Sequence, residues 1–206
     1  MRCQLPAHVQ HIFELLGHPE IDNLQEADSF AQENFIRKGE RWDQQVMTPC
    51  RKAMPENREA LIGDLKGLGM IDEVPFTEKH VTYVGLLGAL KERVELRMDY
   101  LEKLIQEGLT FEYLVLLGGM RELQEFEKAG LPAEIVTESD MMHYVAQHSS
   151  LKDCQIIQVN APMIQKADGT TVRPTTDDTI KHFLANAPKK GSFLVISNNP
   201  YIARNA

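Results

Sequence analysis

The sequence predicts an α/β protein, in which a mostly parallel β-sheet lies between layers of helices and follows a helical N-terminal region. Two observations predict this fold. From about Val81 onward, short continuous apolar runs alternate with amphipathic stretches, as expected for buried strands that are connected by helices. Residues 1–75 are instead polar, favour helices and lack a convincing strand pattern. We therefore divide the chain into a helical N-terminal extension, 1–75, and an α/β domain, 76–206.

Three helices are predicted in the N-terminal extension. The first covers Val9 to Leu16 and ends at Gly17, because glycine and the following proline interrupt helices. The second runs from Asn23 to about Arg41, with Asn23 as N-cap and Glu26 placed as in a capping box. The third covers residues 56–68, where glycines mark its end.

The α/β domain is predicted to alternate strands and helices. Its strands are expected at residues 81–88, 113–117, 134–136, 155–159 and 193–196. Its helices are expected at residues 90–107, 121–129, 137–148 and 177–187. The chain ends shortly after the last strand, where a parallel sheet normally has another helix. Two alternatives stay open: a truncated domain, or a last strand followed by only a short helix.

Composition and charge narrow the classes of function. The 22 basic and 30 acidic residues give a net charge of −8, which disfavours nucleic acid as a partner because polyanions are repelled. The three cysteines are far apart and form no Cys-x-x-Cys pair, which is typical of a reducing compartment. No apolar run is long enough for a membrane span. We expect a cytoplasmic protein, and a homo-oligomer is left open.

Ligand-binding residues are expected directly after the strands, because ligands of parallel sheets bind outside the carboxyl ends of the strands. Glycines there let main-chain N–H groups approach an anion, and arginines can hold a phosphate or carboxylate. The ligand-binding candidates chosen in this way are Gly88, Gly118, Gly119, Arg121, Thr176, Asn198, Asn199 and Arg204. Each also has an ordinary interpretation, since turns between strands and helices often contain glycine, and arginines are common on surfaces.

Two carboxylates at predicted helix starts, Glu138 and Asp178, are the candidates for acid–base catalysis or for binding a ribose. The alternative is that each carboxylate simply stabilises the first turn of its helix. The sequence contains no G-x-G-x-x-G, Walker A or G-x-S-x-G motif, which disfavours a standard dinucleotide site, a P-loop and an acyl-transfer serine. His143 and His148 lie five residues apart without a third ligand, so no metal site is predicted.

The order of these strand-end motifs resembles the YdcF-like family, a domain of unknown function that also includes SanA and ElyC. The resemblance covers about residues 80–206 and rests on five segments. They are Val84-Gly85-Leu86-Leu87-Gly88, Leu116-Leu117-Gly118-Gly119, Thr137-Glu138, Thr175-Thr176-Asp177-Asp178-Thr179, and the run from Leu194 to Pro200 with Arg204. The chain departs from the family at Ala89 and at Asp178-Thr179, lacks the histidine often present in the last segment, and has a longer loop at 162–174.

The resemblance implies a Rossmann-like three-layer sandwich of bacterial type that binds an anionic or nucleotide-like small molecule. S-adenosylmethionine and nucleotides are the implied ligands, and enzymatic activity is left open. Two alternatives are a non-catalytic interaction or scaffold protein that uses its helical N-terminal region, and a metal-assisted phosphoester hydrolase.

Overall fold

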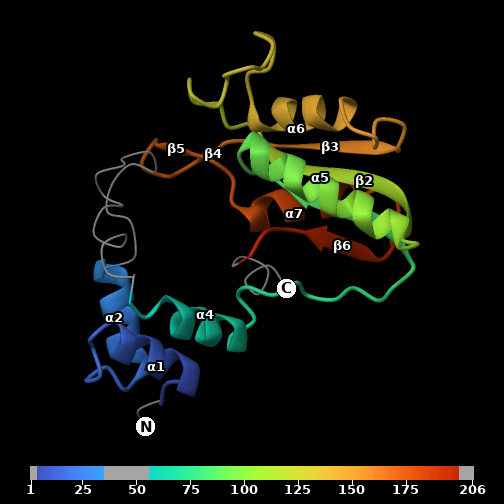
Figure 1. Ribbon diagram of the computed structural model, residues 1–206. Helices are drawn as coiled ribbons and strands as arrows, with labels where there is room; N and C mark the ends of the chain where they lie inside the picture. Colours follow the sequence, from blue (N-terminus) through green and yellow to red (C-terminus); the bar gives the residue numbers. More distant parts are fainter. Residues whose placement is uncertain (1–3, 35–55, 200–206) are drawn as a thin grey trace. The chain divides into compact units, whose positions relative to one another are not determined.

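Four parallel strands form the central sheet (Figure 1). They are β1 (His80–Leu87), β2 (Thr110–Gly119), β3 (Ile156–Ala161) and β6 (Phe193–Ile196), in the order β3-β2-β1-β6. Every neighbouring pair is parallel, and Gly85 of β1 lies opposite Val115 of β2 and Val195 of β6. The predicted α/β fold with a parallel sheet is therefore confirmed.

This computed structural model describes residues 4–34 and 56–199. The chain divides into two compact units, each of which is described by itself. One contains the described residues up to Val74 together with Asn199, and the other runs from Pro75 to Asn198. Within the described residues, no helix combines the length and the apolar character that crossing a membrane requires.

Helices cover both faces of the sheet, which makes the Pro75–Asn198 unit a three-layer sandwich (Figure 1). Helices α5 (Lys91–Gln106) and α6 (Glu138–Gln147) share one buried cluster, to which β1 contributes Val84 and Leu86. Helix α7 (Thr176–Asn186) places Phe183 in a second cluster with Tyr83 and Leu87 of β1. Alternate residues of the strand thus face opposite layers, as the two-residue period of a strand requires.

The order of the strands reverses at one place in the sheet. The chain passes from β1 through α5 to β2, then through α6 to β3, always towards one side of β1. It then returns through α7 to β6, which pairs with the opposite side of β1. The connections through α5 and α6 therefore cover one face of the sheet, and the connection through α7 covers the other face.

The N-terminal unit has a small core of its own. It contains α1 (Ala7–Leu15), α2 (Leu24–Asn34) and α4 (Arg58–Gly67), and its buried apolar cluster includes Phe13, Ile21 and Ala27. Asn23 Oδ1 accepts a hydrogen bond from the main-chain N–H of Glu26 at 3.0 Å, so the predicted N-cap is confirmed. The predicted extension of this helix towards Arg41 lies outside the described residues.

Two predicted elements of the α/β domain are wrong. The segment 121–129 forms turns instead of a helix, because Glu127 folds back to pair with Arg121 and to accept the main-chain N–H of Gln124. The segment 134–136 is no strand of the sheet, because the main-chain N–H of Ile135 closes a turn onto Pro132. The long loop at 162–174 instead carries a short antiparallel hairpin, β4 (Ile164–Gln165) with β5 (Thr171–Val172).

Candidate functional site

The candidate site lies at the edge of the sheet where the parallel strands end. Gly88 follows β1, Gly118 and Gly119 close β2, and Asn198 comes two residues after β6. The main-chain N–H of Gly88 donates to the carbonyl oxygen of Leu117 at 3.0 Å, which holds the ends of β1 and β2 side by side. Four of the predicted ligand-binding residues are thus on the same edge.

Glu138 lies across the ends of these two strands. Its Oε2 accepts a hydrogen bond from the main-chain N–H of Gly119 at 3.4 Å, and its Oε1 accepts one from Arg121 Nη2 at 3.3 Å. A Cβ added to Gly88 would lie only 2.9 Å from the carboxyl carbon of Glu138. Glycine at position 88 therefore leaves the space that the Glu138 carboxylate occupies.

The side chain of Glu138 is not needed to cap its own helix. The N-cap of α6 is Thr137, whose hydroxyl accepts from the main-chain N–H of Asp140, while the Asp140 carboxylate accepts from the main chain of Thr137. Glu138 is therefore free to point back over the strand ends. Its side chain is 17% exposed, so part of it is open to solvent.

Arg121 is the second charged group of the site. Its two terminal nitrogens contact both carboxylate oxygens of Glu127, at 2.7 and 2.9 Å, and one of them also contacts Glu138. The side chains of Arg121 and Glu127 are only 12% and 4% exposed. The expected place of Arg121 in the first turn of a helix is wrong, and the guanidinium is bound by carboxylates of the chain.

Burial and pairing act in opposite directions on these charges. Burial alone would lower the pKa of Arg121, but the carboxylates of Glu127 and Glu138 outweigh it and raise this pKa above its usual value. Burial would likewise raise the pKa of Glu127, but the Arg121 guanidinium holds this pKa below its usual range. Both groups are therefore charged at neutral pH, and the pair is a fixed part of the site.

The two glycines that end β2 let neighbouring elements approach closely. A Cβ on Gly118 would lie 2.9 Å from the Cα of Ser139 in α6, and one on Gly119 would lie 2.7 Å from Pro174, which precedes α7. These close approaches bring the first turns of α6 and α7 to the end of β2. Thr176, the first residue of α7, is therefore near the same edge.

Asp178 has a clear structural role. Its carboxylate accepts hydrogen bonds from the main-chain N–H of Thr175 at 2.8 Å and from the Thr175 hydroxyl at 2.6 Å. Together with the reciprocal bond from the Asp178 main chain, these bonds form the capping box of α7. The bond from the Thr175 side chain is the main cause that lowers the pKa of Asp178. Its predicted catalytic role stays a prediction.

The sequence interpretation overlooked Arg97, which is only 4% exposed although it carries a charge. Its Nη1 donates to the carbonyl oxygens of Leu87 and Gly88, and its Nε donates to Asn198 Oδ1 at 2.7 Å. Arg97 thus joins the end of β1 to the segment that follows β6. The helical period contains a signal for this, because position 97 lies three residues after Val94 and four before Leu101, on the apolar face of α5.

Ser139 is another buried polar residue that was overlooked. Its hydroxyl lies 2.6 Å from Asn160 Oδ1, and it accepts a hydrogen bond from Gln158 Nε2 at 3.1 Å. These bonds join the first turn of α6 to β3. Because Ser139 adjoins Glu138, they fix the start of the helix that carries the candidate carboxylate.

Two predicted residues are not placed with the site. Asn199 belongs to the N-terminal unit, where its Nδ2 donates to the carbonyl oxygen of Asp72 at 2.9 Å. Arg204 lies outside the described residues. Within 4–34 and 56–199, no three His, Cys, Asp or Glu side chains are grouped so that they could hold a metal ion.

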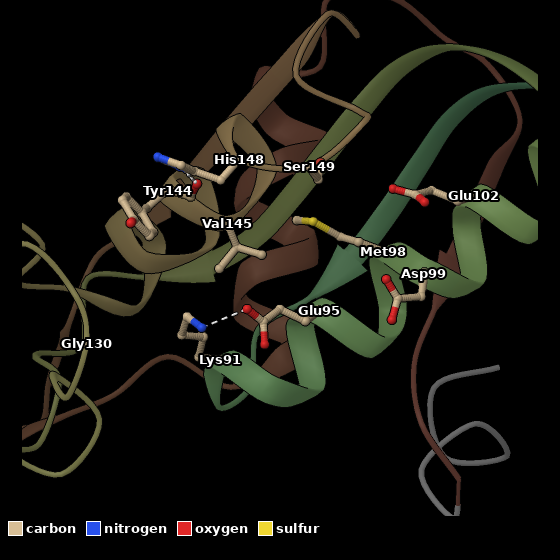
Figure 2. A pocket seen from close by; sticks show the side chains of 10 residues that line it. All are labelled: Lys91, Glu95, Met98, Asp99, Glu102, Gly130, Tyr144, Val145, His148 and Ser149. Carbon is tan, nitrogen blue, oxygen red and sulfur yellow. Dashed lines mark hydrogen bonds and ion pairs between the residues drawn. The ribbon is translucent and has the colours of Figure 1, made fainter.

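A hollow of about 540 Å³ lies between α5 and α6, on the helical layer (Figure 2). Figure 2 shows the Lys91–Glu95 ion pair on its α5 side, with Asp99 and Glu102 further along the same helix. Three carboxylates and one ammonium group on this side give it a negative charge, which does not suit an anionic ligand. The strand-end cluster contains the buried guanidinium of Arg97 and the partly buried one of Arg121, which balance the carboxylates of Glu127 and Glu138, so it remains the better candidate.

Comparison with known proteins gives no match. No protein-family model matches the chain, and no curated protein or solved structure matches it with significance. The resemblance to the YdcF-like family therefore stays a prediction.

Proposed function

We propose that the protein binds an anionic or nucleotide-like small molecule at the carboxyl edge of its sheet, with nucleotides and S-adenosylmethionine as the candidate ligands. One observation carries this proposal. The Glu138 carboxylate lies over Gly88 and next to the N–H of Gly119, at the ends of the two central strands. Open parallel sheets bind their ligands at this edge.

The geometry of Glu138 favours a ligand that donates hydrogen bonds to it. A carboxylate has about four lone-pair sites. Within the described part of the chain, Glu138 receives two hydrogen bonds, and both are long, at 3.3 and 3.4 Å. Hydroxyl groups of a ribose could supply shorter bonds, as acidic residues do in other nucleotide-binding sheets. If the bound molecule reacts, Glu138 is also the residue that is placed to accept or donate a proton.

The test is a calorimetric titration of the full chain with adenosine, adenosine monophosphate and S-adenosylmethionine. The variant Glu138→Gln keeps the shape of the side chain but removes its charge. Because hydrogen bonds to a charged group contribute about 1.5–3 kcal/mol, we expect its affinity for the bound ligand to fall roughly tenfold or more.

The control is Glu122→Gln, which changes the net charge equally at an exposed side chain next to Arg121. It should bind the ligand like the natural chain. The proposal fails if none of the three molecules binds to the natural chain, or if Glu138→Gln binds them equally well.

A further inference from the structure

The end of β1 has two sides, and the site described above uses only the side that faces β2. The order of the strands reverses between β1 and β6, because the connections from β1 lead first to β2 and β3 and only later to β6. In open α/β sheets, such a reversal is the place where loops diverge to opposite faces and where ligands bind. The edge between the ends of β1 and β6 is therefore a second position for a ligand group.

This position holds a buried positive charge. Arg97 is 4% exposed, and the hydrogen bonds described for it go to two carbonyl oxygens and to the Asn198 amide. Among residues 4–34 and 56–199, no carboxylate lies within ion-pair distance of Arg97, and the charge of Glu138 acts on it only from further away. A buried cation without a close counter-charge is costly, and a bound anion would reduce that cost.

Arg97 also fixes the orientation of Asn198. The Nε–H of Arg97 can only donate, so the carbonyl oxygen of the Asn198 amide must face it, at 2.7 Å. The Nδ2 group of Asn198, with two N–H donors, then faces away from the guanidinium. An amide held in this way presents donors to an anion, and Arg97 acts as the positioning residue.

The N-terminus of α5 lies close to this position. α5 begins three residues beyond Gly88, and its N-cap residue, Leu90, makes no side-chain cap hydrogen bond. Its first turn holds Lys91 and Arg93 on either side of Glu92, so the carboxylate of Glu92 offsets one of the two cations. Lys91 pairs with Glu95, and Arg93 is exposed.

We infer that the edge between the ends of β1 and β6 binds the phosphate group of the ligand, through the Nδ2 donors of Asn198 and the charge of Arg97. This inference rests on the proposed function, because it assigns one group of the same ligand. Glu138 takes the hydroxyl groups on the β2 side of Gly88, and Asn198 takes the phosphate on the β6 side.

The decisive variant is Asn198→Asp. It keeps the shape of the side chain but places a carboxylate against Arg97, so that the buried cation gains a counter-ion and the phosphate meets a like charge. Calorimetric titrations with adenosine and adenosine monophosphate separate the two parts of the ligand. We expect the affinity for the monophosphate to fall at least about tenfold, towards that for adenosine, while binding of adenosine itself changes little.

The thermal midpoint of Asn198→Asp should be equal to or above that of the natural chain. This result would show that the loss of affinity for the monophosphate is not caused by unfolding. The control is Asn186→Asp, which adds the same charge in the last turn of α7 and should leave both affinities unchanged. Asn198→Ala removes the donors without adding a charge, so it should lower the affinity for the monophosphate less than Asn198→Asp does.

The possible results separate this inference from the proposed function. Asn198→Asp could bind the monophosphate normally while Glu138→Gln binds neither adenosine nor the monophosphate. The phosphate would then not bind at Asn198, and the proposed function would stand. If Asn198→Asp loses adenosine as strongly as the monophosphate, Asn198 does not recognise the phosphate, and the inference also fails. If the natural chain binds neither adenosine nor the monophosphate, the inference fails, and if it does not bind S-adenosylmethionine either, the proposed function fails with it.

Discussion

Arg121→Gln tests whether the buried ion pair next to the candidate site holds the loop after β2 in place. The substitution leaves the Glu127 carboxylate, which is only 4% exposed, with the main-chain N–H of Gln124 as its remaining described partner. Removing one member of a buried pair costs about 3–5 kcal/mol. Because the bond from Gln124 persists, we take the lower end and expect a loss of about 3 kcal/mol at pH 7, roughly a hundredfold in the unfolding equilibrium.

The loss should depend on pH in a defined direction. In the natural chain, Arg121 keeps the pKa of Glu127 below its ordinary value of 4.5, so this group stabilises the fold above that pH and stops doing so as the pH falls through the lowered pKa. Without Arg121, burial outweighs the remaining hydrogen bond from the main chain of Gln124 and raises the pKa of Glu127. The carboxyl group then takes up a proton on folding, which relieves the destabilisation as the pH falls. The difference between the two proteins should therefore be largest near neutral pH and shrink towards pH 4.

Urea denaturation followed by far-ultraviolet circular dichroism, at several values between pH 8 and pH 4, measures this difference. The double variant Arg121→Gln/Glu127→Gln removes the unpaired charge and should recover much of the lost stability. A loss below about 1 kcal/mol at neutral pH, the range of an exposed ion pair, would refute the assignment of a buried pair. A loss that stays constant down to pH 4 would refute the argument from Glu127.

Two further predictions concern the N-terminal unit. Gly63→Ala in α4 should raise the stability of this unit by about 0.5–1 kcal/mol in urea denaturation, because alanine favours a helix and the added Cβ meets nothing within 4 Å. A loss of stability in this variant would contradict the open space around Gly63. Asp64→Asn should destabilise the unit at pH 7 but hardly at pH 2. The hydrogen bond from His8, aided by that from His11, lowers the pKa of Asp64 below its ordinary 3.8, so the stabilisation by this carboxylate disappears as the pH falls through the lowered value. Equal losses of stability at both pH values would rule out this carboxylate as the cause.

The strands were the most predictable part of the fold. β1 and the buried half of β2 are continuous apolar runs, and such runs specify strands that helices cover on both faces. The prediction of one common edge for the loops followed from parallel pairing alone. The loop between β2 and α6 was predicted wrongly, because its conformation depends on the pairing of Arg121 with Glu127 and Glu138, and local propensity does not encode such contacts.

The candidate site was predictable in position but not in its charges. Glu138 was chosen because it follows a predicted strand, yet it lies at this edge because Thr137 and Asp140 cap α6 and leave its side chain free. Arg97 was missed because a charged residue on a helix is usually assigned to solvent. Its position on the apolar face of α5 was visible in the sequence, but its contact with Asn198, 101 residues away, depends on the strand order.

The two sides of Gly88 differ in charge, and this difference limits which ligands fit the proposed binding mode. On the β2 side, Glu138 and Glu127 share the single guanidinium of Arg121, so negative charge is in excess. On the β6 side, Arg97 is the buried cation, and burial, together with Arg93, lowers its pKa to about 10 although Glu138 acts in the opposite direction. A bare anion would gain from Arg97 but would be repelled by Glu138. A molecule with hydroxyl donors at one end and a phosphate at the other matches both sides, so a nucleoside monophosphate should bind more tightly than either adenosine or inorganic phosphate.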